Sequence, residues 1–350
     1  MHLFTETRKR TNTFKNQNRL LYRMISERRA LEEEFIPREV FHRDTEIGII
    51  SESLGPVTEG DTGIDMLLYG PPGTGKTCIS QYFLERFKEE NPEIRYQYIN
   101  CWEDRTRFKL LYRLLEGIDQ AFDIHRQSTP KDQMLERLKR HDEQYVVILD
   151  EVDQLSEKDL LYDLYQMSNL TMVLIANREE DVFGTLDQRL NSRLQHCVRI
   201  RFDQYGLSEL VTILEDRVRW GLEPDAIGTN QLHLIADAAA GDARVAIATL
   251  RTAASIARQS GATRITESVV ERAVPEAQSE VRQKTADKLT EHQQILHSLI
   301  TEAGEIAPGA LYDQYCEAVD DPKTRRTMRN HLAKLEQYNL IFATGNTKAR

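Results

Sequence analysis

Short apolar runs alternate with amphipathic stretches through the first half of the chain. Four such runs occur, at residues 64–69, 96–99, 145–149 and 171–176. Runs of this length, bounded by turn residues, are typical of buried parallel strands. After the first run and a glycine turn, Ile79, Phe83 and Phe87 recur every four residues, as on the inner face of a helix. Strands that alternate with helices predict a parallel sheet covered by helices on both faces.

The strand pattern ends near residue 203, and the rest of the chain is mainly helical in its periodicity. Helical patterns cover residues 207–220, 230–239, 243–258 and 266–273. The polar stretch 274–286 predicts a linker, and the last block has three helical patterns followed by a β-like end, NLIFATG. We therefore expect an N-terminal extension that is mobile or helical, an α/β domain, a helical domain and a C-terminal domain, over residues 1–35, 36–203, 204–280 and 287–350.

Composition favours a globular protein with several compact units. The chain has 350 residues, of which 40% are hydrophobic, and a formal net charge of -10. This length suits two or three domains, and the acidic total argues against indiscriminate binding to polyanions. No stretch of 18 apolar residues and no signal sequence occurs, and the four cysteines are scattered at Cys78, Cys101, Cys197 and Cys316. We expect no membrane contact and a cytoplasmic, nucleoid-associated location.

Basic residues concentrate at the C-terminal end despite the acidic total. Residues 323–350 hold seven Lys or Arg side chains and one acidic one, Glu336. A local basic surface of this kind can bind nucleic acid, but a solvated face of an amphipathic helix gives the same pattern. Charge alone favours the solvated face.

Residues 70–77 read GPPGTGKT, a complete phosphate-loop motif between a predicted strand and a predicted helix. Backbone N–H groups of such a loop converge on phosphate oxygens at the start of the helix. Lys76 is expected to reach the β- and γ-phosphates, and the Thr77 hydroxyl to bind Mg²⁺. The other expected nucleotide contacts of this segment are Gly70, Pro72, Gly73, Thr74, Gly75 and Cys78.

Two acidic residues follow a second apolar run. In VVILDE, Asp150 ends the predicted strand and Glu151 comes next. This edge of an α/β sheet is where ligands bind, so we expect Asp150 to bind Mg²⁺ and Glu151 to polarise the attacking water. Asn177 follows the run TMVLIA and can bond the γ-phosphate or the water, although Asn is also an ordinary turn residue.

With these motifs in place, the whole chain resembles the archaeal replication initiators, AAA+ ATPases related to eukaryotic origin recognition complex subunits and their loader partner. Beyond the ATPase motifs, the likeness rests on IPREVFHRDTEI (36–47), LDQRLNSRL (186–194), GDARVAIATLR (241–251) and YDQYCEAVDDPKTRRTMRNHLAKLEQYNL (312–340). The resemblance implies an α/β AAA+ P-loop ATPase with an all-α lid and a C-terminal winged-helix domain. It also implies bound ATP or ADP with Mg²⁺.

The resemblance assigns further roles. Arg244 would contact the γ-phosphate in cis from the lid, and Asn177 would be the first sensor. Arg193 would be an arginine finger for a neighbouring molecule, with Arg189 as the rival and a solvated helix face as the alternative for both. The remaining expected nucleotide contacts are Pro37, His42, Arg43, Tyr205 and Arg217. His42 alone would more often be a surface or core histidine.

Residues 323–338 predict a helix with Met328, Leu332 and Leu335 facing inward. In a winged-helix domain this helix enters the major groove, where phosphate contacts position the protein and base contacts give specificity. The candidate DNA-binding residues are Arg325, Arg326, Arg329 and Lys334. The chain ends at TGNTKAR, where the family has a longer wing, so we expect a short wing here.

The expected function is therefore an ATP-dependent initiator that binds double-stranded origin DNA and supports loading of a replicative helicase. ATP binding and slow hydrolysis would act as the switch, and the molecules would associate on DNA. Two alternatives stay open. A clamp-loader ATPase shares the core but lacks a winged helix, and a DNA-binding regulator would use ATP only as a structural ligand.

Overall fold

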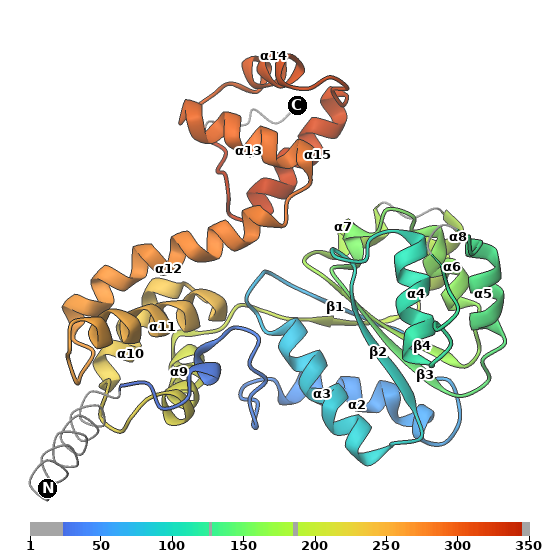
Figure 1. Cartoon of the computed structure of the whole chain (residues 1–350), viewed down its shortest axis with the longest axis horizontal. Helices are drawn as coiled ribbons and strands as arrows, with labels where there is room; N and C mark the ends of the chain where they lie inside the picture. Colours follow the sequence, from blue (N-terminus) through green and yellow to red (C-terminus); the bar gives the residue numbers. More distant parts are fainter. Residues whose placement is uncertain (1–23, 126–127, 185–187, 345–350) are drawn as a thin grey trace, which may run out of the picture. The chain divides into compact units, whose positions relative to one another are not determined.

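The computed structural model describes residues 24–125, 128–184 and 188–344, without the side chains of 188 and 189 (Figure 1). The described residues up to Val270 form one compact unit, and those from Glu271 onward form a second. No helix among the described residues has both the length and the apolar character needed to cross a bilayer.

A five-stranded parallel sheet is the centre of the first unit. Its strands are β1 (Met66–Tyr69), β2 (Arg95–Asn100), β3 (Tyr145–Asp150), β4 (Leu170–Ala176) and β5 (Val198–Arg201). They lie in the order β2-β3-β4-β1-β5. The four predicted strands are confirmed within two residues of their predicted ends. Strand β5 was missed because its sequence, VRIR, lacks an apolar run, and it becomes a strand by pairing with β1 at the sheet edge.

Helices cover both faces of this sheet, as predicted (Figure 1). Their bounds are α2 (Asp44–Thr58), α3 (Lys76–Glu90), α4 (Arg107–Gly117), α5 (Lys131–Lys139), α6 (Asp159–Tyr165), α7 (Glu179–Phe183) and α8 (Gln188–Leu194). Alternate residues of each strand enter different cores. Met66 and Leu68 pack with α2 and α3, whereas Leu67 packs with the helices of the other face. The strands are therefore buried on both sides, which explains their uninterrupted apolar sequences.

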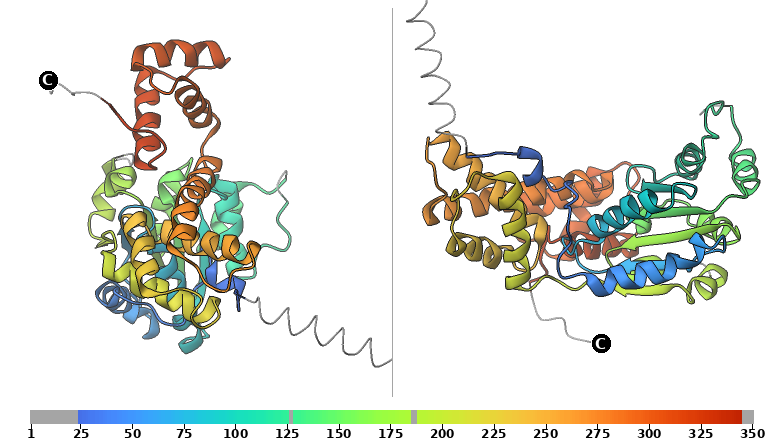
Figure 2. Two further views of the ribbon diagram at one scale, coloured as in Figure 1. Left: turned by 90° about the vertical axis from the view of Figure 1, so that its left-hand side faces the viewer. Right: turned by 90° about the horizontal axis from the view of Figure 1, so that it is seen from below.

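A helical lid follows the sheet, with α9 (Leu207–Gly221), α10 (Thr229–Ala239) and α11 (Ala243–Gln259) close to their predicted ranges. The segment 24–35 packs on this lid rather than extending from it, and both views of Figure 2 show it beside the lid helices. It contains a short 3₁₀ helix, η1 (Arg28–Leu31), in which Leu31 is fully buried. A Cβ at Gly221 would lie 2.7 Å from a Leu31 methyl carbon, so the bare glycine makes this contact with α9 possible.

The predicted linker at 274–286 is wrong, because helix α12 runs from Glu267 to Asp287 without a break. The residues are polar, but most are good helix formers. Among them Ala273, Ala277 and Val281 recur every four residues and are buried, which is the signal that the polar composition concealed.

The second unit contains three further helices, α13 (Glu291–Ala303), α14 (Pro308–Ala318) and α15 (Arg325–Gln337), in a winged-helix-type domain. Met328 and Leu335 of α15 are buried in its core and Leu332 packs against it, as predicted. The β-like end is not a strand in its described part, up to Thr344. A strand needs a neighbour for its backbone hydrogen bonds, and the second unit has no strand among its described residues. The expected wing, TGNTKAR, lies almost entirely outside the described residues.

Candidate nucleotide-binding site

The phosphate loop connects β1 to α3 at the carboxyl edge of the sheet. Gly70 has a φ of 152°, and a Cβ there would lie 2.1 Å from the carbonyl oxygen of Phe202. Gly75, with a φ of 89°, precedes the first residue of α3 and leaves its N-terminal N–H groups without a side-chain cap. The loop therefore has the backbone that a phosphate group requires, and only glycine fits these two positions without strain.

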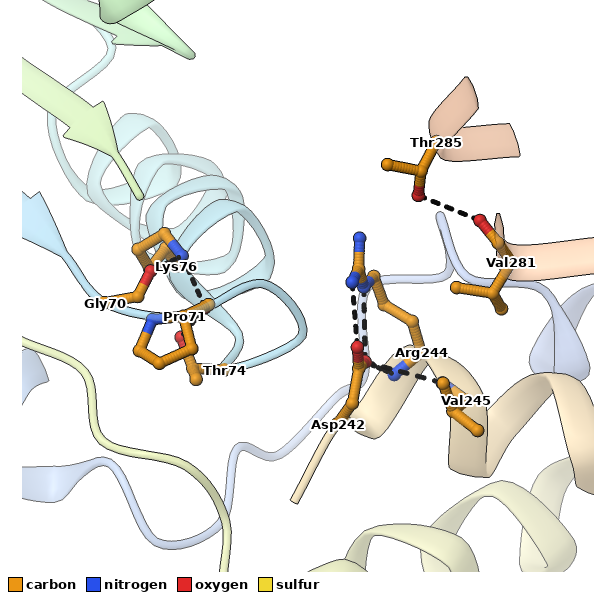
Figure 3. A network of polar contacts seen from close by, with 9 residues as sticks. All are labelled: Gly70, Pro71, Thr74, Lys76, Asp242, Arg244, Val245, Val281 and Thr285. Carbon is orange, nitrogen blue, oxygen red and sulfur yellow. Dashed lines mark hydrogen bonds and ion pairs between the residues drawn. The ribbon is translucent and has the colours of Figure 1, made fainter. Parts of the chain in front are cut away.

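Lys76 begins α3 and is buried beneath this loop. Its Nζ donates hydrogen bonds to the carbonyl oxygens of Gly70 (2.7 Å) and Pro71 (2.8 Å), and Figure 3 shows this contact. Burial lowers the pKa of Lys76 to about 8, while the negative charge of Asp150 opposes the shift. A bound phosphate would bring a negative charge into direct contact with this buried ammonium group and would favour its charged form.

Asp150 ends β3, and its carboxylate is almost completely buried. Its Oδ2 accepts hydrogen bonds from the Thr77 hydroxyl (2.7 Å) and from the Tyr98 phenol (2.8 Å). Its Oδ1 accepts one from the backbone N–H of Glu151 (2.8 Å). A hydroxyl and a carboxylate, both hard oxygen donors next to a phosphate site, match the requirements of Mg²⁺. The predicted pair of Thr77 and Asp150 is therefore in direct contact.

Glu151 and Asn177 lie at the same sheet edge. Glu151 has a φ of 52°, a left-handed conformation that is unusual for a residue other than glycine, before the short helix η2 (Val152–Gln154). Asn177 directly follows β4, and β4 lies between β3 and β1 in the sheet. Asn177 is therefore placed between the Asp150 strand and the phosphate-loop strand.

The lid brings Arg244 to the phosphate loop. The backbone N–H of Ala243, the first residue of α11, donates to the carbonyl oxygen of Gly73 (3.0 Å). Asp242 caps α11 by accepting from the backbone N–H of Arg244, and its carboxylate also binds the Arg244 guanidinium (Figure 3). The first turn of the predicted sensor helix therefore lies directly on the loop.

Arg43, another predicted nucleotide contact, is buried in the same region. Its buried guanidinium donates to the carbonyl oxygens of Thr74 (3.1 Å) and Asp203 (2.7 Å), and it lies over the Tyr205 ring at 4.3 Å. These bonds connect the phosphate loop to the segment that leads into the lid. Neighbouring His42 is exposed, with a φ of 61°.

Cys78, Tyr205 and Arg217 surround the beginning of α3. A Cβ at Gly75 would lie 2.5 Å from the Tyr205 hydroxyl. Arg217 donates to the carbonyl oxygens of Ala30 and Phe35. Phe35 stands two positions before Pro37, which is half-buried. Burial raises the pKa of the Cys78 thiol, and the positive charge of Arg217 opposes this rise. Three predicted contacts that are far apart in the sequence are therefore neighbours beside the phosphate loop, together with the segment that contains Pro37.

The expected finger residue, Arg193, lies on α8. Its guanidinium is 4.8 Å from the centre of the Tyr162 ring on α6. The side chain of its rival, Arg189, lies outside the described residues. Arg193 is half-buried, so part of it remains accessible to a second molecule.

The candidate DNA-binding residues lie on α15, which Thr324 caps at its N-terminus. Arg326 and Arg329 are exposed. Arg325 is also exposed, but it lies over the Tyr312 ring at 4.7 Å and 3.8 Å from Asp313. Lys334 is half-exposed beside the Tyr338 ring. Arg326 and Arg329 therefore have the fewest competing contacts for phosphate.

Sequence reasoning missed two residues of the site, Asp242 and Tyr98. Asp242 belongs to the quoted GDAR segment, and an Asp before an amphipathic helix is an N-cap signal that could have identified it. Tyr98 has no such signal, because its contact with Asp150 depends on how β2 and β3 are aligned.

Comparisons with known proteins match both the α/β domain and the lid. A profile described as "AAA domain" matches residues 65–182, and one described as "Cdc6 AAA+ ATPase-type lid domain" matches residues 211–275. The structure of the Aeropyrum pernix ORC1 protein in complex with DNA is similar, with a TM-score of 0.72 and 25% identity, over 90% of this chain and 88% of that one.

Two relatives from Halobacterium salinarum are closer in sequence. This chain is 56% identical to "ORC1-type DNA replication protein 1" over 88% of this chain and 100% of that protein. It is 45% identical to "ORC1-type DNA replication protein 9" over 93% of each chain. The chain therefore belongs to the ORC1-type DNA replication proteins, AAA+ ATPases with a Cdc6-type lid.

Proposed function

We propose that this protein is an ATP-dependent replication initiator that binds double-stranded origin DNA and switches with its nucleotide state. One observation supports the switch most directly. The first turn of α11 is hydrogen-bonded to the phosphate loop, from the backbone N–H of Ala243 to the carbonyl oxygen of Gly73. The lid is therefore in direct contact with the loop that would surround the phosphates. A change in phosphate occupancy at the loop would therefore reach the lid without an intermediary.

ATP would lie across the loop, with Lys76 and Arg244 neutralising the β- and γ-phosphates. Thr77 and Asp150 would bind Mg²⁺, which supplies charge neutralisation and orients the phosphate oxygens. Glu151 and Asn177 would orient the attacking water at the sheet edge. Cys78, Tyr205 and Arg217 would contact the nucleoside, beside Pro37, His42 and Arg43.

Hydrolysis would also depend on assembly. Arg193 of one molecule would approach the nucleotide of its neighbour, and the positive charge would stabilise the transition state. Molecules that associate side by side on DNA would then hydrolyse ATP faster than isolated ones. Support of helicase loading would be the downstream consequence of this assembly.

The C-terminal domain, proposed to span 287–350, would supply the sequence-directed part of DNA binding. The exposed Arg326 and Arg329 on α15 suit contacts with phosphate or base edges in the major groove. A clamp-loader ATPase has no counterpart of this domain, so its presence favours the initiator. A regulator with structural ATP would not need Glu151, Asn177 and Arg244 together at one edge.

The test combines the positions of the protein's binding sites in the genome with its affinity for DNA duplexes in solution. Crosslinking and sequencing of DNA bound to the full chain in its own host should give a few discrete sites next to starts of replication. Fluorescence anisotropy on one such duplex should show tighter binding than on a scrambled duplex, with a difference between ATP and ADP. Equal affinity for both duplexes, together with sites scattered without relation to replication starts, would rule out the proposed function.

A further inference from the structure

Tyr98 contacts the Asp150 carboxylate, the proposed Mg²⁺ ligand, from the neighbouring strand β2. In the parallel pairing of β2 with β3, Tyr98 is aligned with Ile148, and Asn100 with Asp150. Aligned residues of a parallel pair share a face, so Tyr98 and Asp150 lie on one face, two residues apart along the strands. A tyrosine is long enough to cover this diagonal, and its hydroxyl lies 2.8 Å from Asp150 Oδ2.

The Asp150 carboxylate is fixed by three hydrogen bonds. Thr77 and Tyr98 donate to Oδ2, and the backbone N–H of Glu151 donates to Oδ1. Bonds to both oxygens fix the rotation of the carboxylate plane, which a single bond would leave free. A tyrosine phenol is protonated near neutral pH, so Tyr98 is the donor in its bond to Asp150 Oδ2.

We propose that Tyr98 is a positioning residue for Mg²⁺, which it serves through Asp150. This inference rests on the proposed function, since it needs ATP bound with the metal. Thr77 would offer an oxygen lone pair to Mg²⁺ while its hydroxyl proton stays directed at Asp150 Oδ2, and Tyr98 would hold that carboxylate oxygen in place. The carboxylate then enters the metal site already oriented, and metal binding does not have to supply that ordering.

The decisive variant is Tyr98→Phe, which removes one hydroxyl and keeps the ring in the core. Binding of a fluorescent ATP analogue is titrated against Mg²⁺ in the full chain. The Mg²⁺ concentration for half-saturation should rise about tenfold, a common result of losing a partner of a metal ligand. Affinity for the same nucleotide in excess chelator should stay unchanged, because the phosphate loop is intact.

Tyr96→Phe is the matched control. Tyr96 lies on the same strand and the same face, two residues farther from the carboxyl edge, and is also half-buried. Its substitution should leave the Mg²⁺ half-saturation at the wild-type value. A rise of similar size in both variants would overturn the role of Tyr98, since it would reflect a general loosening of β2.

A double-mutant cycle with Asp150→Asn tests whether Tyr98 acts through Asp150. In the Asp150→Asn background, Tyr98→Phe should have no further effect on Mg²⁺ half-saturation. An additional tenfold rise there, or an unchanged half-saturation in the single variant, would overturn the positioning role alone. If the wild-type protein bound ATP equally well with and without Mg²⁺, the proposed metal-dependent function itself would be overturned.

Discussion

Asp242 and Arg244 form an ion pair with two contacts on the first turn of α11. Nη2 of Arg244 lies 2.8 Å from Oδ2 of Asp242, and Nε lies 3.2 Å from Oδ1. The same carboxylate touches the phosphate loop, because a Cβ at Gly73 would lie 1.8 Å from its Oδ1. The pair uses one edge of the guanidinium and leaves Nη1 available for a phosphate oxygen.

Asp242→Asn should weaken the discrimination of ATP from ADP. The amide can still cap α11, but it loses the charge that orients Arg244 toward the γ-phosphate. We expect the ratio of ADP to ATP dissociation constants to fall several-fold, measured by competition with a fluorescent nucleotide. Asp237→Asn, at an exposed position on α10, is the control and should change nothing. A higher ratio would mean that Asp242 competes with the γ-phosphate for Arg244.

Lys76 should make ATP affinity sensitive to alkaline pH. Its pKa in the free protein is lowered by burial to about 8, whereas bound phosphate favours the charged form. Affinity should therefore fall above pH 8 by up to about tenfold per pH unit. Isothermal titration between pH 7 and pH 9.5 measures this. In Lys76→Arg, whose guanidinium does not titrate in this range, any remaining affinity should be flat over the same interval. Lys76→Ala should abolish ATP binding or weaken it strongly.

The same pKa has the opposite effect on the stability of the nucleotide-free protein. Between the folded value of about 8 and the ordinary value of 10.5, the unfolded chain binds more protons at Lys76 than the folded chain. The contribution of this group to the free energy of unfolding therefore rises with pH across that interval. Denaturant titrations give the free energy of unfolding of wild type and of Lys76→Ala at each pH. The wild-type value minus the variant value should rise between pH 8 and 10.5, and a fall would contradict a lowered pKa of Lys76.

Glu151→Gln should bind Mg-ATP normally and hydrolyse it about a hundredfold or more slowly, because the carboxylate is needed to activate water. Phosphate release under single-turnover conditions measures the rate, and nucleotide titration measures the affinity. Glu157→Gln is the control, since Glu157 is exposed and ion-paired to Lys131. Hydrolysis at the wild-type rate in Glu151→Gln would exclude Glu151 as the group that activates the water.

Arg193→Ala should reduce hydrolysis only where molecules assemble. The finger acts on a neighbour, so mixtures of Arg193→Ala with Glu151→Gln should recover part of the activity at mixed interfaces. Arg201→Ala, at an exposed position on β5, should behave as wild type. A defect that is independent of protein concentration, with no recovery in mixtures, would contradict action in trans.

Replacing three arginines of α15 with alanine should weaken DNA binding and flatten its salt dependence. Each lost phosphate contact on duplex DNA lowers the log–log salt slope by roughly 0.9. Anisotropy titrations at several salt concentrations compare two triple variants with the same change in charge. In the first, Arg325, Arg326 and Arg329 are all replaced with alanine. The second is the control and replaces Arg258, Arg264 and Arg272, which are exposed and lie outside α13, α14 and α15. Identical slopes for both triple variants would contradict the role of α15.

The sequence by itself determined the local elements that carry the candidate site. The phosphate loop and the Asp150–Glu151 pair were predicted correctly as elements because each depends on neighbouring residues: a glycine turn that opens a helix, and an apolar run that ends in a carboxylate. The lid helices followed from the same local periodicity. The linker predicted at 274–286 was wrong because that prediction rested on polarity alone. Exposed residues of a helix and residues of a linker have the same polar composition.

Only the tertiary structure decided which residues meet. The position of β4 between β3 and β1 places Asn177 between the Asp150 strand and the phosphate loop, and no local pattern specifies strand order. The alignment of β2 with β3 brings Tyr98 to Asp150, and the approach of α11 to the loop brings Asp242 to Gly73. These contacts join segments that are tens to hundreds of residues apart, and packing of whole elements selects them, whereas residue patterns record only what is close along the chain.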